Sequence, residues 1–249
     1  MLTVDLNCDM GEGCPNDAEL MKYISSANIA CGYHAGDAET MRRTVDLALA
    51  ARVAIGAHPG YRDRDNFGRT NISLPPDEVI DLVTAQIESL NEICVRQGAS
   101  LHHVKPHGAL YNQAAKNRDL AAAIAEAVAS FDRNLILYGL SGSFLISEGG
   151  SAGLTTASEV FADRTYRPDG TLTPRTEPNA LITNVRQCVE QVIQMVGSRT
   201  VTATDGRTIG LKADTICLHG DGEHAVEFAR TIREALSDAD VGILSPLIS

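Results

Sequence analysis

Short apolar segments alternate with helical patterns along the whole chain. In residues 2–9 the apolar and polar positions alternate strictly, which is typical of a strand with two different faces. Later apolar runs are equally short, and each ends in Gly, His, Asp, Asn or Pro before a helical pattern begins. These runs predict further strands at 28–31, 53–57, 134–138, 158–162 and 215–218, and one that stops at Lys105.

Apolar residues at helical spacing follow most of these strands. Asp37 is well placed to cap the second of the resulting helices, and Gly98 ends the third. A further pair of short strands is predicted around Asp205 and Gly206, a turn pair typical of a β-hairpin. The predicted helices cover residues 17–24, 37–51, 77–98, 119–131, 184–196 and 223–236.

Seven strands separated by helices indicate an α/β fold with parallel pairing through right-handed crossovers. A doubly wound sheet and a β/α barrel both satisfy that rule. Polar residues follow nearly every strand, which favours a barrel, because all its βα loops meet at one mouth. We therefore expect one distorted seven-stranded (β/α) barrel domain over residues 1–249, with a small hairpin insertion near 200–211.

Composition narrows the function classes. The chain has 249 residues, 44% of them hydrophobic, and a net charge of -11, so we expect no nucleic-acid surface. It shows no apolar run of membrane-spanning length and no basic segment followed by an apolar one at its start. The six cysteines form no CxxC pair. These features predict a cytoplasmic protein without a membrane segment.

Four of the seven histidines directly follow predicted strands, and this recurrence points to a site at the barrel mouth. The segment Lys105–Gly108 holds a cation and an imidazole where proline and glycine end a strand. The candidate catalytic residues are Asp9, Glu12, His34, His58, Lys105, His107 and His219. The candidate substrate-binding residues are Asn7, Glu159, Asp163, Arg164, Arg175 and Asp221.

The residue types allow more than one chemistry. Asp9, His58 and His107 supply oxygen and nitrogen ligands for a divalent metal, but the same groups suit metal-free acid–base catalysis. Lys105 can neutralise a carboxylate, stabilise an oxyanion or pair with a neighbouring acid. Arg175, like Arg164, offers a fork of donors for carboxylate or phosphate. No GxxxxGK[ST] loop and no GxGxxG fingerprint is present.

The sequence resembles the LamB/YcsF family in several long segments. These segments occur in the same order as in the family and span essentially the whole chain. The resemblance implies a distorted seven-stranded barrel similar to that of sugar deacetylases. It also implies ATP-dependent opening of the lactam 5-oxoproline to L-glutamate, with Mg²⁺ accompanying ATP and with 5-oxoprolinase subunits B and C as partners. The segments are Asp5–Gly13, Asn28–Asp37, Gly56–Pro59, Val104–Asn112, Glu159–Arg164 and Cys217–Asp221.

Roles within that reaction stay open at this point. Asp9 or Glu12 is expected to activate water, and His107, with one of the other histidines, to transfer protons or bind a metal. Lys105 or Arg164 is expected to hold the carboxylate or a phosphorylated oxygen. Because no P-loop is present, ATP activation is expected to depend on the partners. Two alternatives are a stand-alone metal-dependent deacetylase or amidohydrolase and a non-catalytic lactam-binding subunit; homo-oligomerisation is undecided.

Overall fold

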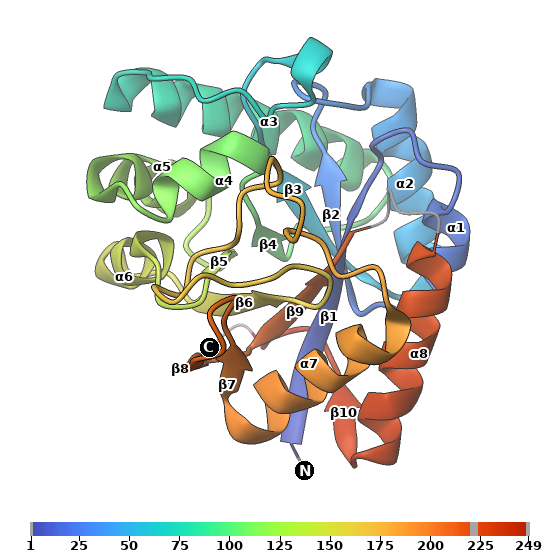
Figure 1. The fold of residues 1–249 in the computed structure, drawn as a ribbon. Helices are drawn as coiled ribbons and strands as arrows, with labels where there is room; N and C mark the ends of the chain where they lie inside the picture. The colour runs from blue at the N-terminus through green and yellow to red at the C-terminus, as the bar shows by residue number, and fades with distance from the viewer. Residues whose placement is uncertain (1, 220–223, 248–249) are drawn as a thin grey trace.

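Seven parallel strands close on one another to form a barrel at the centre of the molecule (Figure 1). The computed structural model describes residues 2–219 and 224–247. The ring closes because β1 pairs with β2 on one side and with β9 on the other. This confirms the predicted barrel. Its strands are β1 (Leu2–Met10), β2 (Ser26–Ala30), β3 (Ala54–His58), β4 (His103–Val104), β5 (Ile136–Leu140), β6 (Thr156–Phe161) and β9 (Thr215–Leu218).

Helices surround the barrel and cover its outer face (Figure 1). Asp37 caps α2 as expected, its carboxylate accepting a hydrogen bond from the Thr40 amide at 2.8 Å. Asn117 and Asn184 cap α5 and α7 in the same way. The helices are α1 (Asp17–Leu20), α2 (Ala38–Ala51), α3 (Pro76–Arg96), α4 (Gly108–Ala114), α5 (Arg118–Phe131), α6 (Phe144–Ser151), α7 (Val185–Ser198) and α8 (Ala225–Asp238), with a 3-10 turn, η1, at Arg64–Asn66.

Three short elements were not predicted. β10 (Val241–Ile243) pairs in parallel with the first residues of β1, outside the ring. α4 has only seven residues, and α6 carries two adjacent glycines, so neither gives a clear helical period. The expected hairpin is present as β7 (Thr200–Thr202) and β8 (Thr208–Gly210). Within the described ranges, every helix is too short or too polar to cross a bilayer.

The lower barrel interior is filled by hydrogen-bonded polar groups. Asp5 is completely buried on β1, and its carboxylate accepts hydrogen bonds from the hydroxyls of Ser25, Ser26, Tyr138 and Thr215 at 2.5–3.1 Å. Burial raises the pKa of Asp5, although each of these hydroxyl bonds favours the charged form. This network ties β1, β2, β5, β9 and the end of the α1–β2 loop together below the mouth.

Replacing Gly56 by alanine is expected to lower the free energy of unfolding by about 1–3 kcal/mol. A Cβ at position 56 would lie 2.1 Å from the His103 imidazole. That ring cannot move freely, because it donates a hydrogen bond to Asn28 at 2.8 Å and stacks on Tyr138. Urea unfolding measures the loss. Gly210→Ala is the matched control, since its Cβ meets nothing within 4 Å; equal stability of the two variants would contradict this packing.

Candidate active site

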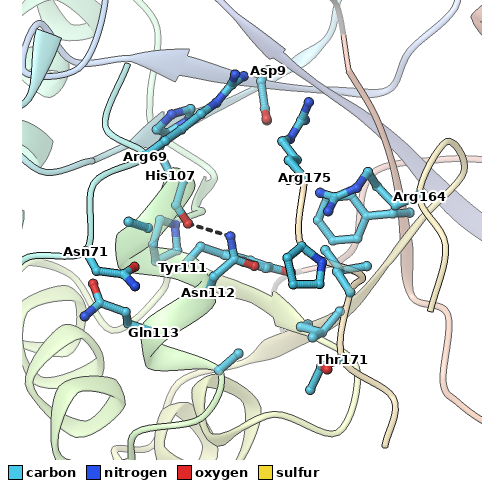
Figure 2. Close-up of a pocket in the computed structure, with 18 of the residues that line it drawn as sticks. Asp9, Arg69, Asn71, His107, Tyr111, Asn112, Gln113, Arg164, Thr171 and Arg175 are labelled. Atoms are coloured by element: carbon cyan, nitrogen blue, oxygen red, sulfur yellow. Dashed lines mark hydrogen bonds between the residues drawn. The ribbon is translucent and has the colours of Figure 1, made fainter. Parts of the chain in front are cut away.

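A cavity of about 790 Å³ opens at the carboxyl ends of the strands. Arg69 and His107 lie on one side of it and Arg164 and Arg175 on the other, with Asp9 between them in the view of Figure 2. The β3–α3 loop, α4 and the long β6–α7 loop form its walls. Polar residues at the ends of different strands therefore face one shared space, as the sequence pattern predicted.

Lys105, directly after β4, is buried in the floor of this cavity at 2% exposure. Its ammonium lies 2.9 Å from a carboxylate oxygen of Asp9 and 2.9 Å from one of Glu159. Burial alone would lower the pKa of Lys105, but the charge of Asp9, followed by Cys217 and Glu159, holds it well above its ordinary value. Of the three expectations for Lys105, pairing with neighbouring acids is the one that the structure supports.

Asn7 and Glu159 lie below this floor and not on the cavity wall. Both are completely buried, and the Asn7 amide donates hydrogen bonds to Glu159 at 3.0 Å and to Thr215 at 2.7 Å. Their expected contact with substrate needs correction, because these side chains point into the barrel one layer below Asp9. We assign them to holding Lys105 in place.

Glu12, in the β1–α1 turn, faces three imidazoles. Its Oε1 atom lies 3.2 Å from Nε2 of His34, 3.3 Å from Nδ1 of His107 and 3.9 Å from Nε2 of His58. His34 stacks on His107 with ring centroids 3.7 Å apart, so it lies behind His107 and does not line the cavity. The carboxyl ends of β1, β2, β3 and β4, or the loops directly after them, thus contribute one side chain each to a compact cluster.

Hydrogen bonds to main-chain carbonyls determine which nitrogens of two imidazoles are protonated. Nδ1 of His58 lies 2.7 Å from the carbonyl oxygen of Lys105, and Nε2 of His107 lies 2.9 Å from that of Phe67. A carbonyl only accepts, so each of these nitrogens carries a hydrogen. The remaining nitrogens, Nε2 of His58 and Nδ1 of His107, lie 2.9 Å apart. Two lone pairs at that distance repel unless a proton or a cation joins them.

The ionisable groups around the cluster hold different charges. Burial would lower the pKa of His58, but the charge of Asp9 raises it above its ordinary value. Burial would raise the pKa of Asp9, yet His58 and Lys105 hold it well below its usual range. Burial, reinforced by neighbouring imidazoles, lowers the pKa of His107 well below the usual value and that of His34 to about 2. Two imidazoles are therefore neutral, the form that binds metals.

The donor set fits a divalent cation. The ligand atoms of Glu12, His34, His58 and His107 all lie within 4.8 Å of one another. Ligands at about 2.1 Å from one ion lie roughly 3–3.5 Å apart. Three pairs here are near that separation: Glu12 with His34 at 3.2 Å, Glu12 with His107 at 3.3 Å and His58 with His107 at 2.9 Å. Nδ1 of His34 is buried without a hydrogen-bond partner, whereas His58 and His107 have the carbonyl partners typical of metal-binding histidines. The sequence proposed Asp9 with His58 and His107; an oxygen of Asp9 lies 3.4 Å from Nε2 of His58, and the structure adds Glu12 and His34 to the two histidines.

A second acid–imidazole pair lies across the cavity. Nδ1 of His219, after β9, lies 2.8 and 2.9 Å from the two carboxylate oxygens of Asp163, after β6. Burial would raise the pKa of Asp163, but His219 and then Arg175 lower it. Asp163 was expected to bind substrate, and here it orients His219, whose ring lines the cavity and stacks on Phe161. The neighbouring candidate Asp221 lies outside the described residues.

The two candidate arginines of the β6–α7 loop, Arg164 and Arg175, have different environments. Arg164 is buried, and its guanidinium donates hydrogen bonds to the carbonyl oxygens of Ala180 and Thr173, so it anchors this loop. Burial and the charge of Arg175 lower the pKa of Arg164 to about 10. Arg175 is exposed, makes no ion pair with any described residue, and extends into the cavity (Figure 2). Arg175 is thus the better placed of the two to receive an anion.

Sequence reasoning missed several cavity residues. Arg69 belongs to a loop whose sequence is polar and contains no recognisable motif. It nevertheless lines the cavity opposite Arg175 (Figure 2). Tyr111 and Asn112 belong to the segment after Lys105, and they reach the cavity because α4 begins at Gly108 and turns them toward it. Recognising that short helix would have identified both.

Fold and site together define a class: a β/α barrel with a carboxylate–imidazole cluster at the carboxyl ends of its strands. The chain belongs to the LamB/YcsF family, whose model matches residues 4–247. It is 54% identical over 248 residues to the A subunit of 5-oxoprolinase from Brevibacillus brevis, covering 98% of both chains. It is 53% identical to the protein of the same name from Tolumonas auensis, covering 98% of this chain and 99% of the relative.

Solved structures give the same family and a wider fold relationship. The crystal structure of a lactam utilization protein from Thermus thermophilus superposes with a TM-score of 0.92 at 41% identity, covering 98% of this chain and 100% of that one. A family 4 carbohydrate esterase from Streptomyces lividans matches with a TM-score of 0.52 at 13% identity, covering 99% and 93%. The second likeness shows the shared barrel fold alone, in agreement with the deacetylase-like barrel expected from the sequence.

Proposed function

We propose that this chain is the ring-opening component of an ATP-dependent 5-oxoprolinase, which converts 5-oxo-L-proline to L-glutamate together with subunits B and C. One observation carries the proposal: groups for holding an anion, activating water and protonating a nitrogen surround a single cavity. The near-full-length relationship to the A subunits of 5-oxoprolinase from two bacteria supports it. Both relatives are named as subunits, which supports the presence of partner subunits for this chain as well.

The substrate is a five-membered cyclic amide that carries one carboxylate. Arg175 offers a fork of donors that matches a carboxylate, and it extends from the β6–α7 loop into the cavity (Figure 2). A carboxylate held there places the ring toward Asp9 and His219, which line the floor and the adjacent wall. Arg164 contributes indirectly, since it fixes the loop that carries Arg175.

Ring opening breaks the amide C–N bond, adds a water oxygen to the carbonyl carbon and gives protons to the nitrogen. Asp9 stays ionised beside Lys105 and His58, so it can accept a proton from water. His219, held by Asp163 through Nδ1, takes up a proton on its other ring nitrogen, and in that imidazolium form it can donate this proton to the leaving nitrogen. These assignments give each side of the amide a proton-transfer group.

A divalent cation held by Glu12, His34, His58 and His107 is part of the proposal. When bound, such an ion polarises a carbonyl oxygen and lowers the pKa of a coordinated water. The chain's own contribution is the fixed orientation of His58 and His107 by the carbonyls of Lys105 and Phe67. Asp9 lies beside this cluster, with one carboxylate oxygen 3.4 Å from Nε2 of His58.

Replacing Glu12 by glutamine is expected to weaken binding of Zn²⁺ or Mn²⁺ at least about tenfold, because a charged ligand becomes a neutral amide. Metal content after equilibrium dialysis measures the change, with about one equivalent expected for the wild-type chain. Glu39→Gln is the control, since Glu39 is exposed on α2 and pairs with Arg42. A wild-type chain that retains no metal under these conditions would contradict the metal assignment.

The reaction class is tested by glutamate release from 5-oxoproline with the purified chain, with and without ATP, Mg²⁺ and subunits B and C. Because the sequence carries no P-loop, turnover is expected only when ATP and both partners are present. Turnover by the chain alone without ATP would instead indicate a stand-alone amidohydrolase. Ligand binding with full activity after loss of the acids and histidines would indicate a non-catalytic lactam-binding subunit.

A further inference from the structure

One completely buried histidine, His103 on β4, takes no part in the reaction described above. It lies in a row that crosses four neighbouring strands, because Asp9 pairs with Asn28, Asn28 with Gly56 and Gly56 with His103. Gly56 has no side chain, so the imidazole of His103 extends over β3 toward β2. A Cβ at position 56 would lie 2.1 Å from Nε2 of that ring. The glycine therefore lets a buried imidazole reach the strand next to Asp9.

Asn28 on β2 joins this imidazole to Asp9. Its side-chain oxygen lies 2.8 Å from Nε2 of His103. Its amide nitrogen donates hydrogen bonds to Oδ1 of Asn7 at 2.7 Å and to Oδ1 of Asp9 at 2.8 Å. Asn28 is completely buried, and both hydrogens of its amide are used. The side chain is therefore held in one orientation.

The groups at its two ends determine which way the Asn28 amide faces. Asp9 is ionised beside Lys105, and a carboxylate only accepts hydrogen bonds, so the nitrogen of Asn28 faces it. The oxygen of Asn28 then faces His103, and Nε2 of His103 must carry a hydrogen. Burial holds the pKa of His103 well below its usual value, so the ring is neutral. His103 is thus assigned to the Nε2–H tautomer.

The two carboxylate oxygens of Asp9 have different surroundings. Oδ1 accepts hydrogen bonds from Asn28 at 2.8 Å and from Lys105 at 2.9 Å. Oδ2 lies 3.4 Å from Nε2 of His58, which is longer than either contact of Oδ1. Asp9 also lines the cavity. Oδ1 is therefore occupied by donors of the barrel interior, and Oδ2 is the oxygen left to meet a water in the cavity.

We propose that His103 and Asn28 are positioning residues for ring opening: His103 orients Asn28, and Asn28 occupies Oδ1 of Asp9, so that Oδ2 accepts the proton of the attacking water. This inference rests on the proposed function, in which Asp9 activates that water. We call the pair the His103–Asn28 relay. It gives a functional reason for a buried imidazole that touches neither the cavity nor the carboxylate–imidazole cluster.

The proton transfer is balanced as follows. The water oxygen bonds to the lactam carbonyl carbon, one water proton passes to Oδ2 of Asp9, and the electron pair of the C=O bond moves to the carbonyl oxygen. That pair then returns to the carbon, the C–N bond breaks, and the nitrogen takes a proton from His219. Asp9 releases its proton to solvent as the product leaves. Each turnover therefore needs the same oxygen of Asp9 to be free again.

Steady-state kinetics of the enzyme assembled with subunits B and C test the relay. His103→Phe retains an aromatic ring but removes the N–H donor, and Asn28→Ala removes the hydrogen bond to Asp9 directly. Each is expected to lower the turnover number about 10–100-fold with a nearly unchanged KM for 5-oxoproline, the effect of losing one hydrogen bond to a charged group. Because His103 acts through Asn28, the double variant should lose no more than Asn28→Ala alone. Fully additive losses would overturn the relay.

Tyr138→Phe is the matched control for loss of stability. Tyr138 is as deeply buried as His103 and stacks on it, but its hydroxyl donates to Asp5 at 3.1 Å and not to Asp9. Tyr138→Phe should lower the melting temperature and keep the turnover number. An equal loss of turnover in Tyr138→Phe and His103→Phe would assign His103 to folding alone and overturn the relay.

A measurement on the wild-type chain alone separates the relay from the proposed function. NMR of histidine ring nitrogens labelled with ¹⁵N reports the tautomer, and His103 is expected to carry its hydrogen on Nε2. The Nδ1–H tautomer would turn the oxygen of Asn28 toward Asp9 and overturn the relay, as would full turnover in both His103→Phe and Asn28→Ala. The expected tautomer in a wild type that forms no glutamate with its partners would count against the proposed function alone. This test stands even where a variant fails to fold.

Discussion

Replacing Lys105 by methionine is expected to lower the free energy of unfolding by about 3–5 kcal/mol, because removal of one partner leaves buried carboxylates without compensation. Lys105 is 2% exposed and lies 2.9 Å from both Asp9 and Glu159. The same substitution should abolish glutamate formation, since Asp9 loses Lys105, which together with His58 holds it ionised. Urea unfolding at pH 7 measures the stability, and the assembled enzyme measures the activity.

The pH dependence separates this explanation from simple loss of packing. The pKa of Asp9 is held below its ordinary value in the wild type, so its contribution to stability is present above the unfolded pKa of about 3.9 and is lost as pH falls. Without Lys105, the buried carboxylate of Asp9 takes up a proton more readily, so the deficit of Lys105→Met should shrink as pH is lowered toward 4. Adding Glu159→Gln, which removes one of the two unpaired charges, should recover part of the stability. A deficit that is independent of pH and unaffected by Glu159→Gln would contradict the charge explanation.

Replacing Asp163 by asparagine is expected to reduce the turnover number about 10²–10⁴-fold while leaving the KM for 5-oxoproline nearly unchanged. The carboxylate accepts the Nδ1 hydrogen of His219 through both oxygens, and an amide in its place can favour the other tautomer. Asp163 acts through His219, so it is a positioning residue. Steady-state kinetics of the assembled enzyme measure the split between turnover number and KM.

If the role of Asp163 were purely structural, the remaining activity of Asp163→Asn would keep the pH profile of the wild type. Loss of the carboxylate that binds His219 should instead shift one limb of that pH profile. Asp205→Asn is the control, because Asp205 lies in the exposed turn of the β7–β8 hairpin and pairs only with nearby Arg207. His219→Gln should lose as much activity as Asp163→Asn or more. Full turnover in Asp163→Asn would remove His219 from the proposed proton transfer.

Strand periodicity together with the polar residues that follow the strands predicted the barrel, but these patterns did not give the depth of each polar residue. Asp5, Asn7 and Asp9 share one face of β1, and each step of two residues advances roughly 6.6 Å along the strand. Only Asp9 reaches the cavity; Asn7 and Asp5 lie in successive layers below it. A candidate list drawn from one face therefore mixes residues that contact ligand with residues that support them.

The sequence also could not predict which side chains from distant segments contact one another. The sequence places Lys105, Asp163 and His219 at strand ends, and all three lie at the mouth. It does not show that Asp163 faces His219, or that Glu12 meets three histidines, because those contacts depend on how loops from different strands turn. Arg69 had no local signal, since it lies in a loop without regular secondary structure beyond one 3-10 turn.

The central claim is that the lactam opens in the cavity of this chain. The most direct test introduces Glu12→Gln into this chain alone, assembles it with subunits B and C, and measures glutamate formation. Glu12 faces three imidazoles and lines the cavity, yet it lies apart from the polar network that ties the lower barrel together. We predict a loss of at least about 10²-fold in turnover, with unchanged thermal melting and unchanged assembly with the partners. Wild-type turnover by that enzyme would contradict the claim and move the chemistry to one of the partners.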